Sequence, residues 1–388
     1  MLKAKPKTAP PPAAALSARA LTIRRMDVFP VALPLAKPMK MARVLIRNAE
    51  NLFVRIETSG GDVGWGEAAS APGMTGETHW GMAAMAELLG EHVVGADARM
   101  RPRLLARLDK AVYGNTSVKS AIEMALIDVT GRALGINASD LLGGRFHDRV
   151  VPMWLIGNAT VEEDVADVRR QLQAGFRFFK LKVGSKPLEA DIEAAHAVRA
   201  ALGPDIMLCA DANCGLGMAN AARFLRETVA AKLCFLEQPI APGNLAGMAQ
   251  LQALGCAPIG ADESIHALAD IEQHAAHDAL SGLSLKLIKL GGPTALLRAA
   301  HRAGALGLSI NVAAKVSETS LGSAAAAHCA ACIANADWGI SLTHVYLAHD
   351  PVKHALAMHD GAVLPPDGPG WGVEVDEAAI REFAAKRE

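Results

Sequence analysis

The sequence lacks the features that would point to a nucleic acid, a membrane or an oxidising compartment. The formal net charge is −1 and no dense basic stretch occurs in the folded part, so we expect no nucleic-acid partner and no anionic membrane partner. A continuous run of about 18 apolar residues, the length that a transmembrane helix needs, is also missing. The six cysteines show no disulfide framework, so we expect a cytoplasmic protein that acts on small molecules.

Two of the cysteines stand close to a histidine and could be mistaken for a metal or redox motif. Cys329 and Cys332 follow His328, but no second pair lies nearby to complete a zinc site. The alanine-rich residues 324–331 around them predict a helix. We therefore interpret both cysteines as small core residues.

The length of 388 residues suits an α/β barrel together with a modest second domain. Residues 1–21 are rich in Pro, Ala and Lys, and Pro10–Pro12 interrupt the apolar core that a signal peptide would require. We predict a disordered leader there. Residues 22–146 then show strand patterns, a Gly60-Gly61-Asp62 hairpin turn and helical periodicity from about residue 77, which together predict an α+β capping domain.

From residue 147 to 345 short apolar strands alternate with amphipathic helices. The eight strand candidates are VPMWLI, FFKLKV, IMLCAD, KLCFLE, PIGAD, LSLKL, LSINV and WGISL. Strands buried on both faces read as continuous apolar runs, and eight such units predict a (β/α)₈ barrel. Residues 346–388 are expected to return to the capping domain.

Acidic residues mark the ends of three successive predicted barrel strands. Asp211, Glu237 and Asp262 would converge at the carboxyl-terminal face, where barrel active sites lie. Oxygen ligands of this kind suit Mg²⁺, or alternatively Mn²⁺. Each acid alone could equally be a helix N-cap, since each lies at a strand-to-helix turn.

Lysines flank the three acids. Lys180 and Lys182 lie two apart on one strand and so point to the same face, and Lys286 lies on a strand across the barrel. A general base near pH 7 needs a lysine pKa lowered from about 10.4 to about 7–8, which a like charge and a nearby cation would favour at Lys182. The alternative is that Lys180 and Lys182 simply pair with the acids. Lys289 is expected to be a partly solvated loop charge.

The motifs built on these residues resemble those of the enolase superfamily, in its muconate-lactonizing-enzyme subgroup. They are Lys180–Lys182, Asp211–Asn213, Glu237–Pro239, Asp262–Ser264, and Lys286 before Gly291-Gly292. The mandelate racemase branch instead uses a seventh-strand histidine, whereas the seventh strand here ends in Asn311-Val312-Ala313. The resemblance runs from about residue 22 to the end of the chain.

The resemblance implies an isomerase or lyase in which Mg²⁺, held by the three acids, stabilises the enediolate formed when the proton next to a substrate carboxylate is removed. Lys182 and Lys286 would be the acid/base residues, and Lys180 a charge that tunes them and contacts the carboxylate. Glu318 matches a glutamate of the subgroup's pocket that contacts substrate or assists proton transfer; its alternative role is a structural cap. A homo-oligomer is also expected.

The substrate is the point that the sequence leaves open. A muconate cycloisomerase-like reaction is the first prediction, and a racemase, epimerase or dehydratase of an amino-acid-derived carboxylate is the alternative; a non-catalytic barrel is the third. Cap loops near Lys37–Arg47 and Ser70–Trp80 should cover the barrel mouth, with His79 and Trp80 as substrate contacts. Asn213 is a further candidate contact, and Lys315 could hold a second carboxylate or pair with Glu318.

Overall fold

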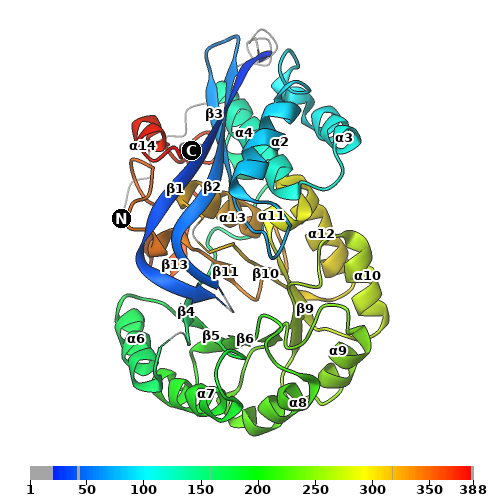
Figure 1. Ribbon diagram of the computed structural model, residues 1–388, viewed down its shortest axis with the longest axis vertical. Helices are drawn as coiled ribbons and strands as arrows, with labels where there is room; N and C mark the ends of the chain where they lie inside the picture. Colours follow the sequence, from blue (N-terminus) through cyan, green and yellow to red (C-terminus); the bar gives the residue numbers. More distant parts are fainter. Residues whose placement is uncertain (1–20, 42–43, 158, 317, 386–388) are drawn as a thin grey trace.

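The computed structural model describes residues 21–41, 44–157, 159–316 and 318–385. These residues form a closed barrel of eight parallel strands with helices around it, and a smaller part made of strands and helices that covers the barrel (Figure 1). This is the α/β barrel with an N-terminal cap that the sequence predicts. The predicted disordered leader lies outside the described residues, except for Leu21.

The cap is built on a three-stranded antiparallel sheet in the order β1–β2–β3. The strands are β1 (Ile23–Met41), β2 (Val44–Thr58) and β3 (Val63–Ala69). A tight turn joins β2 to β3: Gly61 has φ +86°, and the Thr58 N–H donates to the Asp62 carbonyl at 2.9 Å. A positive φ of this kind favours glycine, so the predicted hairpin is confirmed.

Three helices complete the cap, namely α2 (His79–Gly90), α3 (Arg101–Ala111) and α4 (Thr116–Leu134). Helix α4 is buried along almost its whole length, and it packs on β3 and on barrel helix α11 (Leu287–Leu290). A Cβ atom at Gly64 or Gly66 of β3 would lie 2.2 Å from Val129 N or 1.9 Å from Ala121 O. These two glycines therefore let α4 lie directly on the strand.

The barrel strands close in the order β10-β11-β4-β5-β6-β7-β8-β9. Their bounds are β4 (Pro152–Ile156), β5 (Phe178–Lys182), β6 (Met207–Asp211), β7 (Leu236–Glu237), β8 (Ile259–Ala261), β9 (Gly282–Leu285), β10 (Ser309–Val312) and β11 (Ile340–Ser341). All eight coincide with the predicted apolar runs. Because parallel strands all end at the same face of a barrel, their terminal polar residues gather at one mouth.

Helices alternate with these strands on the outside of the barrel (Figure 1). They are α6 (Val161–Gln173), α7 (Leu188–Leu202), α8 (Met218–Glu227), α9 (Leu245–Gln252), α10 (Leu268–Ala276), α12 (Pro293–Ala305) and α13 (Ser320–Ala331), besides α11. The short α5 (Ala138–Leu141) precedes the barrel. Cys329 and Cys332 are buried in and directly after α13, as expected of core residues.

The C-terminal segment returns to the cap, as predicted. It contains β12 (Met358–His359), β13 (Ala362–Val363) and α14 (Glu377–Glu382). The Trp371 indole N–H donates to the Met124 carbonyl of α4 at 3.0 Å, and the Ala385 N–H donates to the Pro30 carbonyl of β1 at 2.8 Å. From these contacts we propose to keep the predicted divisions after residues 146 and 345. Of the helices in the described ranges, none has the length and apolar character that a membrane crossing needs.

Candidate active site at the barrel mouth

The predicted acids and lysines meet at the carboxyl-terminal ends of five neighbouring strands. Lys182, Asp211 and Glu237 are the last residues of β5, β6 and β7, and they are successive partners in the sheet register. Asp262 follows β8 directly, and Lys286 follows β9. Since β5 and β9 stand four places apart in the closed barrel of eight, Lys182 and Lys286 approach the mouth from opposite sides.

None of the three acids caps the helix that follows its strand. The N-cap residues of α8, α9 and α10 are Gly217, Asn244 and Ala267. The alternative reading of the acids as helix N-caps is therefore wrong. Their carboxylates are buried at the mouth instead.

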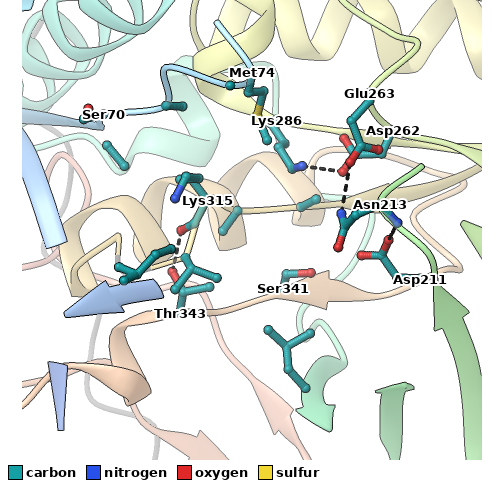
Figure 2. A pocket seen from close by; sticks show the side chains of 18 of the residues that line it. Ser70, Met74, Asp211, Asn213, Asp262, Glu263, Lys286, Lys315, Ser341 and Thr343 are labelled. Carbon is teal, nitrogen blue, oxygen red and sulfur yellow. Dashed lines mark hydrogen bonds and ion pairs between the residues drawn. The ribbon is translucent and has the colours of Figure 1, made fainter. Parts of the chain in front are cut away.

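Each carboxylate is engaged by an ammonium group. Lys180 Nζ lies 2.5 Å from Glu237 Oε2, and Lys182 Nζ lies 2.5 Å from Asp211 Oδ2. Lys182 also donates to Asn213 Oδ1 at 2.9 Å. Lys286 pairs with Asp262 (Figure 2). The pairing of lysines with acids that the sequence left open is thus present. As the side chains stand, no three His, Cys, Asp or Glu residues in the described ranges are placed to enclose an ion.

Burial and mutual charge shift the pKa values of these groups in opposite directions. Burial and the neighbouring Asp211 carboxylate raise the pKa of Glu237 to about 7. For Asp262, burial is outweighed by Lys286 and Lys289, so that its pKa is lowered. Burial also acts against the charge on Lys286, but the Asp262 and Glu263 carboxylates raise its pKa. Carboxylates that influence one another in this way form one electrostatic cluster.

Lys289 corrects one prediction from the sequence. Instead of a solvated loop charge, it is 1% exposed and its ammonium lies 2.6 Å from Asp262 Oδ1. The chain turns into α11 immediately after β9, and this short helix points the Lys289 side chain inward. Asp262 therefore stands between two lysines.

Gln238 is a second residue whose role was missed. It has φ +37° directly after β7, and its side-chain oxygen accepts hydrogen bonds from the Asp262 and Ser264 N–H groups at 3.0 and 3.1 Å. Left-handed backbone at a non-glycine residue is uncommon and clusters at functional sites. Asn213, with φ +41°, shares this feature after β6. The Glu-Gln-Pro motif was the signal that could have identified Gln238.

A cavity of about 850 Å³ opens above this cluster, a volume within the range of small-molecule sites. Its floor is formed by the strand-end residues, and its wall by cap residues 45–51 and 69–74 together with residues 313–316 (Figure 2). Both predicted cap regions therefore reach the cavity in part. Asn213 lines it as well, and its amide donates to Glu263 Oε1 at 3.0 Å.

His79 and Trp80 do not line this cavity, so their predicted substrate contact is corrected. The cap loop reaches the cavity only as far as Met74, and His79 already begins helix α2. His79 is buried, with its Nε2 3.2 Å from the Asn51 carbonyl. Trp80 lies instead at a small hollow beside β1 and the end of the chain. The start of the helix turns both rings into the cap.

Lys315 and Glu318 lie on the segment between β10 and α13. The side chain of Lys315 lines the cavity, and no ion pair joins it to Glu318 or to another residue within the described ranges. Burial and the nearby Lys286 lower its pKa. Glu318 is buried behind the lining residues, and its carboxylate accepts the Lys315 N–H at 2.9 Å. Burial raises the pKa of Glu318 to about 7.

Known proteins share this architecture. Residues 23–143 match the family model of the mandelate racemase / muconate lactonizing enzyme N-terminal domain, and residues 163–379 match the enolase C-terminal domain-like model. Muconate cycloisomerase 1 of Pseudomonas putida is 32% identical over 90% of this chain and 94% of its own.

Two solved structures are also similar over nearly the whole chain. The muconate lactonizing enzyme of Pseudomonas fluorescens, complexed with muconolactone, superimposes with a TM-score of 0.90 at 30% identity, covering 95% of this chain and 100% of that one. An N-succinyl Arg/Lys racemase from Bacillus cereus gives 0.88 at 25% identity, covering 95% and 99%.

Proposed function

Because this chain belongs to the enolase superfamily, in its muconate-lactonizing-enzyme subgroup, and is thereby an enzyme of the isomerase or lyase type, we propose that it removes the proton next to a substrate carboxylate. The observation that carries the proposal is the arrangement of Lys182 and Lys286. The two amines reach the same cavity from opposite sides of the barrel, with the acidic cluster between them.

The acidic cluster has the composition of a magnesium site. Asp211, Glu237 and Asp262 offer carboxylate oxygens only, which are the ligands that hard divalent cations prefer. Beside them Glu263 Oε2 is buried and has no hydrogen-bond partner in the described ranges, so the cluster holds more acceptor capacity than its neighbours satisfy. We therefore assign the three acids to Mg²⁺, with Mn²⁺ as the other candidate. When bound, such an ion would neutralise the charge that proton removal leaves on the substrate carboxylate.

The lysine ammonium groups are paired with carboxylates, and the charge of these carboxylates must be neutralised before a lysine can act as a base. In their present ion pairs, carboxylates raise the pKa values of Lys180 and Lys286 against the effect of burial. A divalent cation on the acids would take over their charge and remove this stabilisation, since a nearby cation favours the neutral amine. Lys182 and Lys286 would then accept or return the proton on opposite faces of one carbon.

Lys315 favours substrates that carry a second anionic group. No ion pair is found for its ammonium in the described ranges, whereas the other cavity lysines Lys180, Lys182 and Lys286 each pair with a carboxylate, so Lys315 is placed to pair with an anionic group of the substrate. Muconate has two carboxylates, so a cycloisomerase-like reaction is our first candidate. An N-succinyl amino acid also has a second carboxylate, and likeness to a racemase of such compounds keeps racemisation as the second candidate. A part for Glu318 in proton transfer and a homo-oligomeric state remain predictions.

Solvent-deuterium exchange at the α-carbon tests the proposal. The enzyme, loaded with Mg²⁺ in D₂O, is incubated with a panel of dicarboxylates, proline derivatives and N-acyl amino acids. At least one compound should exchange, and turnover of that compound should fall by about 10³-fold in Lys182→Met and in Lys286→Met, the scale of general acid–base catalysis. Product analysis then separates lactone formation from racemisation and loss of water.

The single variants also separate the two candidate reactions. If the enzyme transfers a proton from one face of a carbon to the other, each single variant should still exchange one enantiomer, while the double variant exchanges neither. Lys353→Met, in an exposed ion pair with Glu374, is the control. Full turnover in both active-site lysine variants would refute the assignment.

A further inference from the structure

Glu67 of the cap sheet makes an unusual set of contacts with the barrel. It lies in β3, is 2% exposed, and accepts four hydrogen bonds. The Asn51 amide donates at 3.0 Å, the Thr319 N–H at 2.6 Å and the Gly322 N–H at 3.0 Å, and the Thr319 hydroxyl is the fourth donor. One carboxylate thus joins two cap strands to the first turn of α13, 252 residues away in the sequence.

The turn that Glu67 holds comes directly after the cavity wall. Residues 313–316 line the cavity, Glu318 supports Lys315 from behind, and Thr319 is the N-cap of α13. Gly322 lies between the two acids, since a Cβ there would stand 3.3 Å from Glu67 Oε2 and 3.1 Å from Glu318 Cβ. Any shift of this turn would therefore move the wall segment and Lys315 with it.

The other anchor of the same turn shows what is specific to Glu67. Asp350 accepts hydrogen bonds from the Ser320 N–H at 3.2 Å and from the Ser320 hydroxyl at 2.6 Å. Asp350 belongs to the C-terminal segment, whereas Glu67 is bonded to Asn51, which itself lines the cavity from the cap side. A continuous series of hydrogen bonds, from Asn51 through Glu67 to Thr319, thus connects the two walls of the cavity.

We propose that Glu67 is a positioning residue that holds the wall residues 313–316 at a fixed distance from the cap, and so places Lys315 for the second anionic group of the substrate. The part that concerns the substrate rests on the proposed function; the mechanical part does not. All four groups around the carboxylate are donors, which suits its ionised form, although burial raises the pKa of Glu67 to about 8. A glutamine at this position would turn an amide N–H₂ toward donors and leave one of them unsatisfied.

Hydrogen exchange without substrate tests the mechanical part. In Glu67→Gln the backbone amides of residues 318–323 should exchange at least about tenfold faster than in the wild type, because one anchor of the turn is weakened. Glu77→Gln is the matched control, since Glu77 is also a buried glutamate that caps a helix, accepting the Ser117 and Val118 N–H groups, but wholly within the cap. It should leave residues 318–323 unchanged.

Kinetics on a dicarboxylate that the wild type turns over tests the part that concerns the substrate. Glu67→Gln should raise KM about tenfold with kcat within about twofold, the pattern of lost uniform binding. Thr319→Val, which removes the hydroxyl donor to Glu67 together with the N-cap acceptor of the Leu321 N–H, should also raise KM, and Thr319→Ser, which keeps both, should restore wild-type KM. The double variant Glu67→Gln/Thr319→Val should be no worse than either single variant if both act through one contact.

The outcomes are distinguishable. Wild-type exchange rates at residues 318–323 in Glu67→Gln, or equal changes in the Glu77→Gln control, would overturn the positioning role. Faster exchange with unchanged KM would overturn the link to the substrate. If the wild type turns over no carboxylate at all, the proposed function fails, and the amide exchange result still decides whether Glu67 holds the wall.

Discussion

The lysines on the floor of the cavity and the lysine on its wall differ in their ion-pair partners. Each lysine that lines the floor has a carboxylate within ion-pair distance: Lys180 with Glu237, Lys182 with Asp211, and Lys286 with Asp262, which also pairs with the buried Lys289. On the wall, Lys315 lines the cavity, and no ion pair is found for it among the residues that the structure describes. The lysines of the floor are thus paired within the protein, whereas the wall presents an ammonium group with which a ligand can pair.

The difference follows from how the two regions are built. The floor is the end of a closed sheet, where the strand register fixes neighbouring side chains to one another, as Lys182 is fixed to Asp211 and Asp211 to Glu237. The wall is an irregular segment between β10 and α13, held by contacts with the cap and the C-terminal segment. We therefore expect the floor to carry the chemistry that members of a family share, and the wall to determine which substrates bind.

Removing an acid from the floor should have the largest effect. Glu237→Gln deletes one of the three proposed magnesium ligands, so metal affinity should weaken and α-proton exchange should fall at least about 10³-fold, about 4 kcal/mol of barrier. Isothermal titration with Mg²⁺ and the D₂O assay measure both. Asp191→Asn is the control, because Asp191 is a buried barrel acid outside the cavity lining that accepts the Gly184 N–H at 2.7 Å. Unchanged magnesium affinity in Glu237→Gln would remove it from the metal site.

Lys289 offers a test of the floor's charge balance that does not depend on activity. Breaking a buried ion pair from one side leaves an uncompensated charge, so Lys289→Met should lower the free energy of unfolding by about 3 kcal/mol, the lower end of the usual range, because Lys286 still pairs with Asp262. Urea unfolding measures this loss. An unchanged denaturation midpoint would mean that Lys286 alone balances Asp262.

Much of this molecule could be predicted from local sequence patterns. The eight apolar runs identify the barrel strands, because a strand buried on both faces must be apolar throughout. The positions directly after those runs then identify Asp211, Glu237, Asp262 and the lysines. Both inferences need only the pattern of apolar residues along the sequence and the rule that parallel barrel strands end at the same face.

What the patterns missed depends on contacts between distant segments. Lys289 turns inward because α11 starts at once after β9, and His79 turns away from the cavity because α2 starts there. Glu67 looks like an ordinary residue at the end of a strand, and its partner Thr319 lies in a different part of the chain. Helix starts and long-range pairs of this kind are set by tertiary packing, which a single sequence does not display.

The wall should respond more weakly than the floor, and only to ligands with two anionic groups. Lys315→Met should raise KM for a dicarboxylate about tenfold, about 1.4 kcal/mol, with little change in kcat, and should leave KM for a monocarboxylate unaffected.

Because burial and Lys286 lower the pKa of Lys315, the wild-type ammonium loses its charge as the pH rises through that lowered value. Dicarboxylate KM in the wild type should therefore climb with pH earlier than an ordinary lysine would allow, and the Lys315→Met profile should lack this rise. Equal KM increases for mono- and dicarboxylates would mean that Lys315 shapes the cavity without pairing to the substrate, and the contrast between wall and floor would then be steric.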